Sequence, residues 1–179
     1  VEAKQKEINN PNAMNLATVG NDLRPNSRIV LLKSYDDSGF VFYTNLNSRK
    51  GIKIKQNAYV VLNFFWKTLL KQITIEGIAK VVPNRIANEY YDSRPKISRI
   101  GAWASNQSSE LKNREELEKK VTEFQKKFKG KKIPRPLHWS GYKVKPSLIE
   151  FWQEMPFRLH DRVEFSISKK GWTGRRLYP

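Results

Sequence analysis

The chain has 179 residues and carries 34 Lys and Arg against 17 Asp and Glu, which gives a formal net charge of +17 at pH 7. A chain of this length buries roughly 70% of the surface that its unfolded form exposes, so one domain can build a core without disulfides or metal ions. The absence of Cys excludes disulfides, thiolate nucleophiles, Cys-ligated zinc and iron–sulfur clusters. Any redox chemistry must therefore come from a bound cofactor.

The sequence shows no targeting or membrane segment. Its longest apolar runs, at 60–62 and 64–66, are far shorter than a spanning helix, and the N-terminus lacks the basic and then apolar pattern of a signal peptide. We therefore expect a cytoplasmic protein, and the opening at Val1 without Met leads us to expect a missing upstream segment. The positive charge favours anionic partners such as nucleic acid, membrane surfaces or phosphorylated small molecules, without choosing among them.

The chain begins with a polar, helix-compatible stretch over 1–10 and continues with strands. Apolar and polar residues alternate over 14–19 and stop at a Gly-Asn-Asp turn, which predicts a strand. A second strand over 27–35 and a third over 40–44 are expected to form a hairpin around the turn residues 36–39.

A short helix and two long strands follow. The helix is expected over 48–56, with the Ser at its start as N-cap. Aromatic and β-branched residues over 58–66 and 70–82 predict two strands, and the short link between them predicts a hairpin. A helical stretch then covers 83–91, and the chain should turn before Pro95.

The longest helix is expected over 113–129, because Asn113 can cap it, apolar residues recur on one face and Gly130 can end it. Further strands are expected at about 147–153, 160–168 and 172–177. Mostly antiparallel strands with inserted helices predict a mainly β fold of the barrel type, in a single domain over 1–179.

Motifs for the common nucleotide cradles and for serine hydrolases are missing. No G-x-G-x-x-G or G-x-x-x-x-G-K-[ST] occurs, so any phosphate must be held by side chains. His138 and His160 are too few for a multi-histidine site, and no metal is expected. No G-x-S-x-G elbow supports a serine hydrolase.

Basic side chains bracket the apolar segment 28–33. Alternation places Arg28 on one face of the predicted strand and Lys33 on the other. A bound phosphate would offset the cost of holding these charges there, through charge-assisted hydrogen bonds. A strand whose two ends simply reach solvent explains the same pattern, so both interpretations stay open.

Two further groups suit a phosphate. Arg49 and Lys50 lie at the predicted helix start, where free backbone N–H groups and the positive end of the helix dipole favour an anion. Tyr90 and Arg94 are four residues apart and can lie over one another on a helix face, with Ser98 after the bend. A solvated first turn and ordinary surface polarity are the alternatives.

The densest group is 151–153 followed by 158–162. Alternation predicts Arg158, His160 and Arg162 on one face of a strand, which would suit an anionic, aromatic ligand. On the residues alone, a hydrogen-bonded structural role for the histidine and a core position for Trp152 are the simpler interpretations.

Taken in order, these segments closely resemble the pyridoxine/pyridoxamine 5′-phosphate oxidase family over about residues 12–179. Each motif is short, and the ordered set is very specific. The motifs are Asn12-Ala13-Met14, Arg28-x-Val30-Leu31-Leu32-Lys33, Phe42-Tyr43-Thr44-Asn45, Ser48-Arg49-Lys50, Ser93-Arg94-Pro95, Ile100-Gly101-Ala102-Trp103, Gln107-Ser108-Ser109, Ile149-Glu150-Phe151-Trp152-Gln153 and Arg158-Leu159-His160-Asp161-Arg162.

The resemblance implies an FMN-binding split β-barrel that works as a homodimer, with two flavin sites at the subunit interface and contacts from both chains. By matching motif, the residues that bind FMN would be Arg28, Ile29, Val30, Leu31, Leu32, Lys33, Tyr43, Thr44, Arg49, Lys50, Gln72, Gln107, Ser108, Trp152 and Arg162. The residues that bind substrate would be Lys33, Tyr90, Arg94, Ser98, Arg158 and His160, the last two being catalytic.

The implied activity is the oxidation of pyridoxamine 5′-phosphate or pyridoxine 5′-phosphate to pyridoxal 5′-phosphate. Two electrons, formally a hydride, pass from C4′ to the flavin N5, and O2 then reoxidises the flavin to give H2O2. Because the cofactor carries the electronic step, the protein's task is to stack the substrate and fix it through its phosphate. Neither a membrane nor a specific nucleic acid is implied as a partner.

Two features depart from the family pattern. Glu154-Met155-Pro156-Phe157 stand where the family more typically has a glycine pair, so we expect a stiffer loop onto the substrate. Family members also use a segment upstream of Val1 to cover the substrate, and its absence bears on lid closure rather than on the flavin site.

Two other functions stay open. Basic and aromatic residues mix over 126–132 and 169–172, as they do in proteins that bind single-stranded nucleic acid, although a solvated helix face explains the first. Another split-barrel flavoprotein, such as a flavin reductase, would keep the flavin motifs and would have no reason to keep the basic segment 158–162. A yellow protein would separate both flavin functions from nucleic-acid binding.

Overall fold

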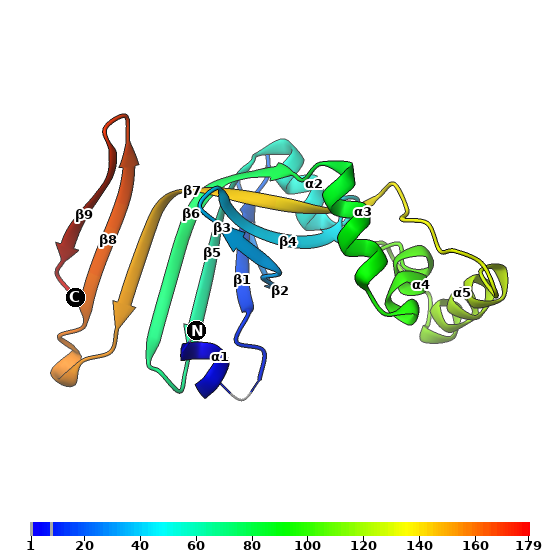
Figure 1. Ribbon diagram of the computed structural model, residues 1–179, viewed down its shortest axis with the longest axis horizontal. Coiled ribbons are helices and arrows are strands. Elements are labelled where there is room, and N and C mark those ends of the chain that lie inside the picture. Colours follow the sequence, from blue (N-terminus) through cyan, green and yellow to red (C-terminus); the bar gives the residue numbers. More distant parts are fainter. Residues whose placement is uncertain (1, 8) are drawn as a thin grey trace. The chain divides into compact units, whose positions relative to one another are not determined.

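The computed structural model describes residues 2–7 and 9–179. Contacts divide the chain into two compact units, which are described separately below. The barrel unit contains the described residues of Val1–Phe42, Lys53–Lys80 and Lys143–Pro179, and the helical unit contains Tyr43–Ile52 and Val81–Tyr142. In chain order the elements are α1 (Glu2–Lys6), β1 (Ala13–Val19), β2 (Pro25–Leu31), β3 (Ser34–Asp36), β4 (Gly39–Asn45), α2 (Arg49–Gln56), β5 (Tyr59–Trp66), β6 (Lys71–Val81), α3 (Asn84–Ser93), α4 (Lys96–Ala104), α5 (Arg114–Lys127), β7 (Trp139–Gln153), a 3₁₀ turn (Pro156–Arg158), β8 (Asp161–Ser168) and β9 (Gly171–Leu177) (Figure 1).

Among the described residues, one sheet of nine strands carries most of the fold. Its order is β2-β1-β5-β6-β7-β4-β3, with β8 paired to β7 and β9 paired to β8 (Figure 1). The paired registers of β1 with β2 and β5, of β5 with β6, and of β7 with β8 are antiparallel. The predicted mainly β fold with inserted helices is confirmed.

Side-chain alternation creates the core of the barrel unit. Met14, Leu16 and Thr18 on β1 are buried, whereas the residues between them are half-buried on the opposite face. Leu62 on β5 lies opposite Leu16, and Ile75 on β6 lies opposite Leu62. Because these three apolar residues are all at most 1% exposed, one sheet face forms the barrel interior.

The predicted single strand over 27–35 is wrong, because the structure has two strands there. β2 pairs with β1, whereas β3 pairs with β4. Between them, the Leu32 amide donates to the Asn12 carbonyl and the Lys33 amide donates to the Val41 carbonyl, both at 2.8 Å. The chain thus leaves one edge strand and joins the other within two residues, which curls the sheet into a partly closed barrel.

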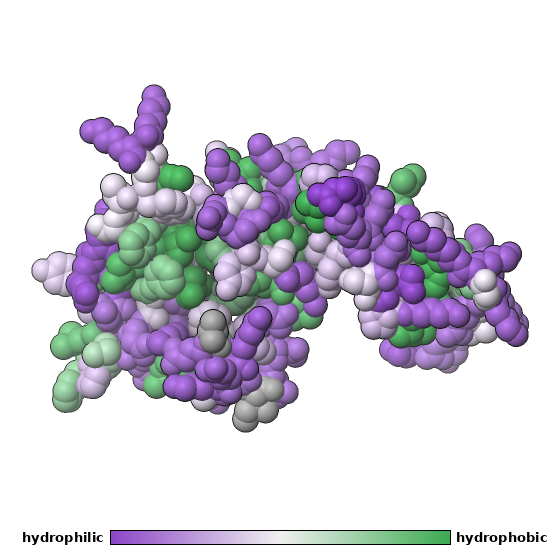
Figure 2. Space-filling model, in the orientation of Figure 1, coloured by the Kyte–Doolittle hydropathy of each residue, from purple (hydrophilic) through white to green (hydrophobic). Residues whose placement is uncertain are grey.

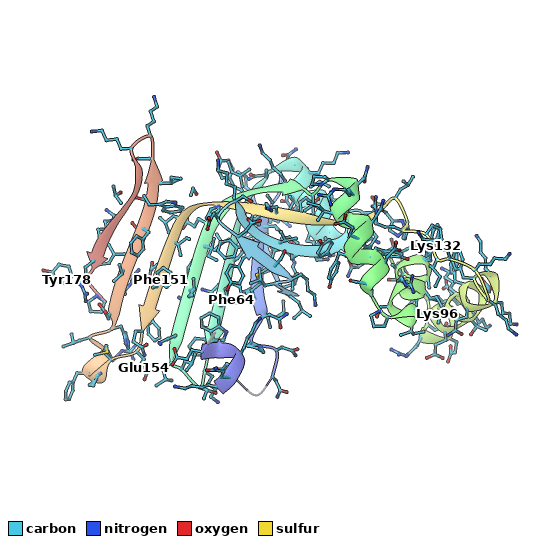
Figure 3. All side chains as sticks on the ribbon, in the orientation of Figure 1. Phe64, Lys96, Lys132, Phe151, Glu154 and Tyr178 are labelled. Carbon is cyan, nitrogen blue, oxygen red and sulfur yellow. The ribbon has the colours of Figure 1, made fainter. Side chains whose placement is uncertain are left out.

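The N-terminal segment packs against the β5–β6 hairpin of the barrel unit. Glu2 pairs with Lys71 at 2.9 Å, and the Thr68 amide donates to Glu7 Oε1 at 2.9 Å. A cavity of about 440 Å³ lies beside it, with Phe64 of β5 and Phe151 of β7, labelled in Figure 3, among its mainly apolar lining. Figure 2 shows apolar side chains gathered over β6 and β7, bordered by polar residues.

The helical unit has a separate aromatic core. Tyr91, Ile100, Phe128, Ile133 and Trp139 form its buried cluster. Asn113 caps α5 as predicted, because its Oδ1 accepts from the Glu116 amide at 2.9 Å. Phe124 and Val121 of α5 pack against the same cluster, as the predicted apolar face requires.

Helix α4 was not predicted from the sequence. Pro95 bars Arg94 from the helical conformation, and this feature indicates a turn. The same residue starts α4 as its N-cap, with φ −52° and ψ 143°. A proline is well tolerated at a helix start, because its missing N–H would have no partner there.

Candidate functional site

The start of α2 gathers three of the predicted cofactor residues in the helical unit. Lys50 is 8% exposed, and its Nζ donates to Thr44 Oγ1 at 3.1 Å and to Gln107 Oε1 at 3.2 Å. It also donates to Ser48 Oγ at 3.0 Å. These three oxygens are neutral, so they orient the ammonium and do not themselves cancel its charge.

Backbone geometry at the same place adds to the positive field. The first bond of α2 runs from the Ile52 amide to the Ser48 carbonyl, so the N–H groups before Ile52 are not bonded within the helix. The Gly51 amide meets Ser48 Oγ only at 3.4 Å. Arg49 begins the helix and is exposed. A helix start with two adjacent cations suits a phosphate monoester.

Gln107 and Ser108 lie in the polar segment after α4. A cavity of about 240 Å³ is lined there by residues 104–111 together with Leu117 and Lys120 of α5. Ser108 has a φ of 74°, in the left-handed region that few non-glycine residues adopt. Such strain at a polar loop is typical of ligand contacts.

In the helical unit, Arg94 packs against a stack of aromatic rings. Tyr43 stacks on Tyr90 with ring centroids 3.9 Å apart and on Trp139 at 5.4 Å. The Arg94 guanidinium carbon lies 4.6 Å from the Trp139 ring centroid and 5.8 Å from that of Tyr91. This contact is a cation–π interaction on a largely desolvated ring.

Arg94 is the clearest candidate for an anion-binding group. Its Nη1 is buried and has no hydrogen-bond partner among the described residues. Burial lowers the pKa of Arg94, since water no longer stabilises the charge. A buried guanidinium N–H without an acceptor is costly, and a phosphate oxygen would remove that cost. The structure therefore fits a phosphorylated ligand here.

Tyr90 and Arg94 do not share a helical face, and that prediction is wrong. α3 ends at Ser93, and Arg94 follows in an extended conformation with φ −76° and ψ 149°. Both side chains nevertheless reach the Trp139 ring, Tyr90 with a centroid distance of 6.2 Å. Ser98 lies half-buried in the first turn of α4.

The predicted segment 28–33 lies in the barrel unit, on β2 and the link after it. Arg28 Nη1 donates to the Leu16 carbonyl at 3.0 Å and to Thr18 Oγ1 at 2.8 Å. Nη1 of Arg28 therefore forms hydrogen bonds within the sheet, to β1. Ile29 is 66% exposed and Leu31 is 37% exposed, whereas Val30 and Leu32 are half-buried. Lys33 is exposed beyond the end of the strand.

The end of β7 and the start of β8 bring together Trp152, His160 and Arg162. The Trp152 and His160 ring centroids are 4.7 Å apart, and Trp152 lies opposite Arg162 in the register. Arg162 makes a two-pronged salt bridge to Glu150, at 2.8 and 3.0 Å. The Glu150 carboxylate raises the pKa of Arg162.

The ring nitrogens of His160 have different roles. Nδ1 accepts from the Met155 amide at 3.3 Å, so in the neutral ring the proton resides on Nε2. The histidine borders a cavity of about 650 Å³ that is also lined by Met155, Leu159 and Tyr178. A neutral His160 can therefore donate one hydrogen bond to a ligand in this cavity.

The prediction that Arg158, His160 and Arg162 alternate on one strand face is wrong. β8 begins only at Asp161, and Arg158 lies in the 3₁₀ turn before it. Phe157 and Arg158 have φ values of 59° and 62°, so the left-handed pair starts at the last residue of 154–157, where the family more typically has a glycine pair. The exposed arginine side chain is thus presented by a strained turn rather than by a strand.

Two partners of these residues, Trp139 and Glu150, could not be predicted from the sequence. Trp139 supports Arg94 and Tyr43, yet a single tryptophan after a proline-containing stretch gave no signal. Glu150 forms a salt bridge with Arg162. The antiparallel register of β7 and β8 brings these two side chains together, because it pairs Glu150 with Glu164, two residues from Arg162.

The described residues carry no sign of a metal site or a membrane helix. Over 2–7 and 9–179, no three His, Cys, Asp or Glu side chains lie close enough together to hold a metal ion. Within the same ranges, no helix is both long enough and apolar enough to cross a bilayer.

Family models match the chain in two segments. Residues 1–128 match the model described as Pyridoxamine 5′-phosphate oxidase. Residues 139–179 match the model described as Pyridoxine 5′-phosphate oxidase C-terminal dimerisation region.

Curated relatives are similar over nearly the whole chain. A pyridoxine/pyridoxamine 5′-phosphate oxidase of Sinorhizobium fredii is 48% identical over 180 residues, which cover 99% of this chain and 87% of the relative. One of Chelativorans sp. is 50% identical over 179 residues, which cover 99% and 86%.

Solved structures share the fold. PhzG from Burkholderia lata 383, in complex with tetrahydrophenazine-1-carboxylic acid, has a TM-score of 0.94 at 30% identity and covers 99% of this chain and 87% of its own. A pyridoxamine 5′-phosphate oxidase-related, FMN binding protein from Nostoc punctiforme has a TM-score of 0.78 at 12% identity, over 99% and 93%. The expected split β-barrel is confirmed.

Proposed function

Because the chain belongs to the pyridoxamine 5′-phosphate oxidase family, we propose that it oxidises pyridoxamine 5′-phosphate and pyridoxine 5′-phosphate to pyridoxal 5′-phosphate, with FMN as cofactor. The amine reaction consumes O2 and water and yields the aldehyde, ammonia and H2O2. The alcohol reaction consumes O2 and yields the aldehyde and H2O2. When bound, FMN supplies the two-electron acceptor that is reoxidised by O2.

FMN would be held by its phosphate and along its ring. The buried Lys50, with Arg49, Thr44, Gln107 and Ser108 around the start of α2, suits the phosphate. The other contacts proposed from the resemblance are Arg28 to Lys33, Tyr43, Gln72, Trp152 and Arg162.

The protein would act as a homodimer with flavin sites at the subunit interface. The match of residues 139–179 to a dimerisation region supports the dimer. Exposed apolar side chains on the sheet, such as Ile29 and Phe65, at 66% and 55%, also call for cover by another surface.

The substrate phosphate would meet Arg94, and this single observation carries the proposal. Its buried Nη1 lacks an acceptor among residues 2–7 and 9–179, next to Tyr90 and close to the first turn of α4, which contains Ser98. A phosphate monoester supplies the missing acceptors and the negative charge. The resemblance also implies Lys33 as a phosphate contact.

The chain's own residues would then hold the pyridine ring. Nε2–H of His160 donates to a ring substituent, because Nδ1 is engaged by the Met155 amide. Arg158 positions the ring and stabilises charge that develops on it during oxidation. Holding the two reactants in place lowers the entropic part of the activation free energy of a bimolecular reaction, on the order of 7 kcal/mol in good cases.

A steady-state assay in air tests the proposal. The FMN-loaded protein should convert pyridoxamine 5′-phosphate into equal amounts of aldehyde and peroxide. Arg158→Leu should lower turnover on the order of 100-fold while flavin content stays within about 2-fold of wild type. Unchanged turnover in this variant would refute the role of Arg158.

The similarity to PhzG supplies a second candidate, oxidation of a reduced tricyclic carboxylic acid. The curated oxidases are more similar, at 48–50% identity against 30%. Offering tetrahydrophenazine-1-carboxylic acid in the same assay decides between them. Turnover of that acid without turnover of the phosphate ester would favour the second candidate.

A further inference from the structure

Four polar side chains form a row across the outer face of the sheet in the barrel unit. Asn15 of β1 lies opposite both Ile29 of β2 and Asn63 of β5, and Asn63 lies opposite Thr74 of β6. Directly opposed residues share a sheet face, as do residues two apart in a strand, so Gln72 belongs to the same face. We call Asn15, Asn63, Thr74 and Gln72 the amide row.

Proposed flavin contacts lie at both ends of the amide row. Gln72 ends the row on β6, whereas Ile29 and, two residues on, Leu31 share its face on β2. The opposite face carries Met14 and Leu16 of the barrel interior. The row therefore occupies the outer surface of the sheet, on the side that presents these contacts.

Thr74 is the centre of the hydrogen bonding in the row. Its Oγ1 accepts from Asn63 Nδ2 at 2.9 Å and from Gln72 Nε2 at 3.4 Å. All three side chains are half-buried. The Thr74 hydroxyl can bond either end of the Gln72 amide, and the bond from Asn63 holds that hydroxyl in place. The position of the Gln72 side chain is thus restrained from within the sheet.

Asn15 points to a partner beyond the row. Its Oδ1 is buried and has no hydrogen-bond partner among the described residues. Buried polar groups are costly when they are partly satisfied, and apolar β-branched residues would suit these strand positions better. The row is therefore incomplete in the single chain and suits contact with a ligand or subunit that supplies a donor.

We propose that Thr74, supported by Asn63, is a positioning residue for the flavin and acts through the Gln72 amide. It restrains the Gln72 side chain at the place where the amide would bond the flavin ring when the cofactor is bound. The inference rests on the proposed function, which makes Gln72 a flavin contact. Thr74 itself touches neither flavin nor substrate in this role.

Three threonine substitutions test the role of Thr74. Thr74→Val removes the acceptor at nearly constant shape and should weaken FMN binding about 3- to 10-fold, as expected for one hydrogen bond of ordinary strength. Thr74→Ser keeps the hydroxyl and should stay within about 2-fold of wild type. Thr173→Val makes the same change on β9, away from the row, and should leave FMN affinity at the wild-type value.

The readouts are the FMN dissociation constant, from quenching of flavin fluorescence, and the absorption spectrum of the bound flavin. Thr74→Val should shift the visible bands, because the hydrogen bond at the ring changes, and Thr74→Ser should restore them. If Thr74→Val does not fold, Asn63→Leu tests the same network from its other side and should produce a shift in the same direction.

A double-mutant cycle with Gln72→Met separates positioning from simple packing. If Thr74 acts through Gln72, Thr74→Val should add less than about 2-fold in the Gln72→Met background. A full additional loss in that background, or a Thr74→Val protein with wild-type affinity and spectrum, would overturn the inference. Absence of saturable FMN binding by the wild type would overturn the proposed function as well, so the two failures are distinct.

Discussion

At the scale of single residues, the Arg94 guanidinium is only partly hydrogen-bonded within the described part of the chain. Arg94 rests on the Trp139 ring and keeps a buried Nη1 without an acceptor among the described residues. Such a group destabilises the free protein, and a bound anion offsets this cost. The same residue can therefore cost folding stability and provide substrate affinity.

Replacing Arg94 should affect substrate binding more than flavin binding. Arg94→Leu removes charge-assisted hydrogen bonds, each contributing about 1.5–3 kcal/mol, so KM for pyridoxamine 5′-phosphate should rise about 10- to 100-fold. Steady-state kinetics with FMN-saturated protein measures this change. Arg85→Leu on α3, where Arg85 is exposed and paired with Glu89, is the matched control. A variant that folds, holds flavin and keeps the wild-type KM contradicts the phosphate role of Arg94.

Only part of the surroundings of Arg94 could be predicted from the sequence. The spacing of Tyr90, Arg94 and Ser98 suggested an anion, and only the resemblance identified it as a phosphate ester. The structure brings Tyr90 and Arg94 to Trp139 by a different route, because the helix ends between them. Long-range aromatic support of this kind leaves no periodic signal in the sequence.

At the scale of elements, close backbone packing fixes the β4 strand against β7. A Cβ on Gly39 would lie 2.2 Å from the Val144 carbonyl oxygen, and its φ of 140° is one that side chains rarely adopt. Glycine therefore permits both the turn before β4 and the approach of β7.

Gly39→Ala should lower the free energy of unfolding by at least about 2 kcal/mol, since both the clash and the backbone conformation are unfavourable. Gly101→Ala is the matched control within α4, because no atom lies within 4 Å of its added Cβ. That change should be neutral or stabilise by up to about 1 kcal/mol. Chemical denaturation of both variants measures the difference, and equal effects would contradict the packing argument.

The β3–β4 hairpin also contains an acid-sensitive contact. Hydrogen bonds from Ser38, followed by those from Lys143, lower the pKa of Asp36 from 3.8 to about 2. Ser38 Oγ lies 2.5 Å from Oδ1, and Lys143 Nζ lies 3.0 Å from Oδ2. Because the folded state favours the carboxylate, this contribution is full above the unfolded pKa near 4 and is lost as pH falls through 2.

Asp36→Asn should therefore reduce the acid sensitivity of stability. Between pH 5 and pH 2, wild type should lose more stability than the variant, whose amide does not titrate. Thermal melts across this range provide the test. Parallel loss in both proteins would show that Asp36 is not stabilised as a carboxylate in the fold.

Most elements could be predicted, because strand alternation and capping are local properties. β1, β5, β6 and α5 follow the alternation and the Asn113 cap within a few residues. The break between β2 and β3 could not be predicted, since Leu32 and Lys33 remain apolar and basic in sequence while their amides change partner strands. The turn at 157–158 was missed for a similar reason, because neither residue favours a left-handed conformation.

At the scale of the whole molecule, the chain supplies two sets of groups that the proposed reaction needs. The helical unit carries Lys50 and Arg94, whereas the barrel unit carries Gln72, Arg158 and His160. The net charge of +17 attracts phosphorylated ligands to either set.

A homodimer is expected in solution. Sedimentation equilibrium at micromolar concentration should give twice the 21.0 kDa mass of the chain, with one FMN bound per chain. A monomer that still binds FMN with one-to-one stoichiometry and oxidises the substrate would contradict flavin sites built from both chains.

The proposed activity requires that the bound flavin and the bound phosphate ester react with one another. Mixing the FMN-loaded protein with pyridoxamine 5′-phosphate without oxygen tests it in a single turnover. We predict bleaching of the visible flavin band with one pyridoxal 5′-phosphate formed per flavin reduced, and no bleaching with unphosphorylated pyridoxamine at the same concentration. A flavin that stays oxidised in the presence of the bound phosphate ester would contradict the account.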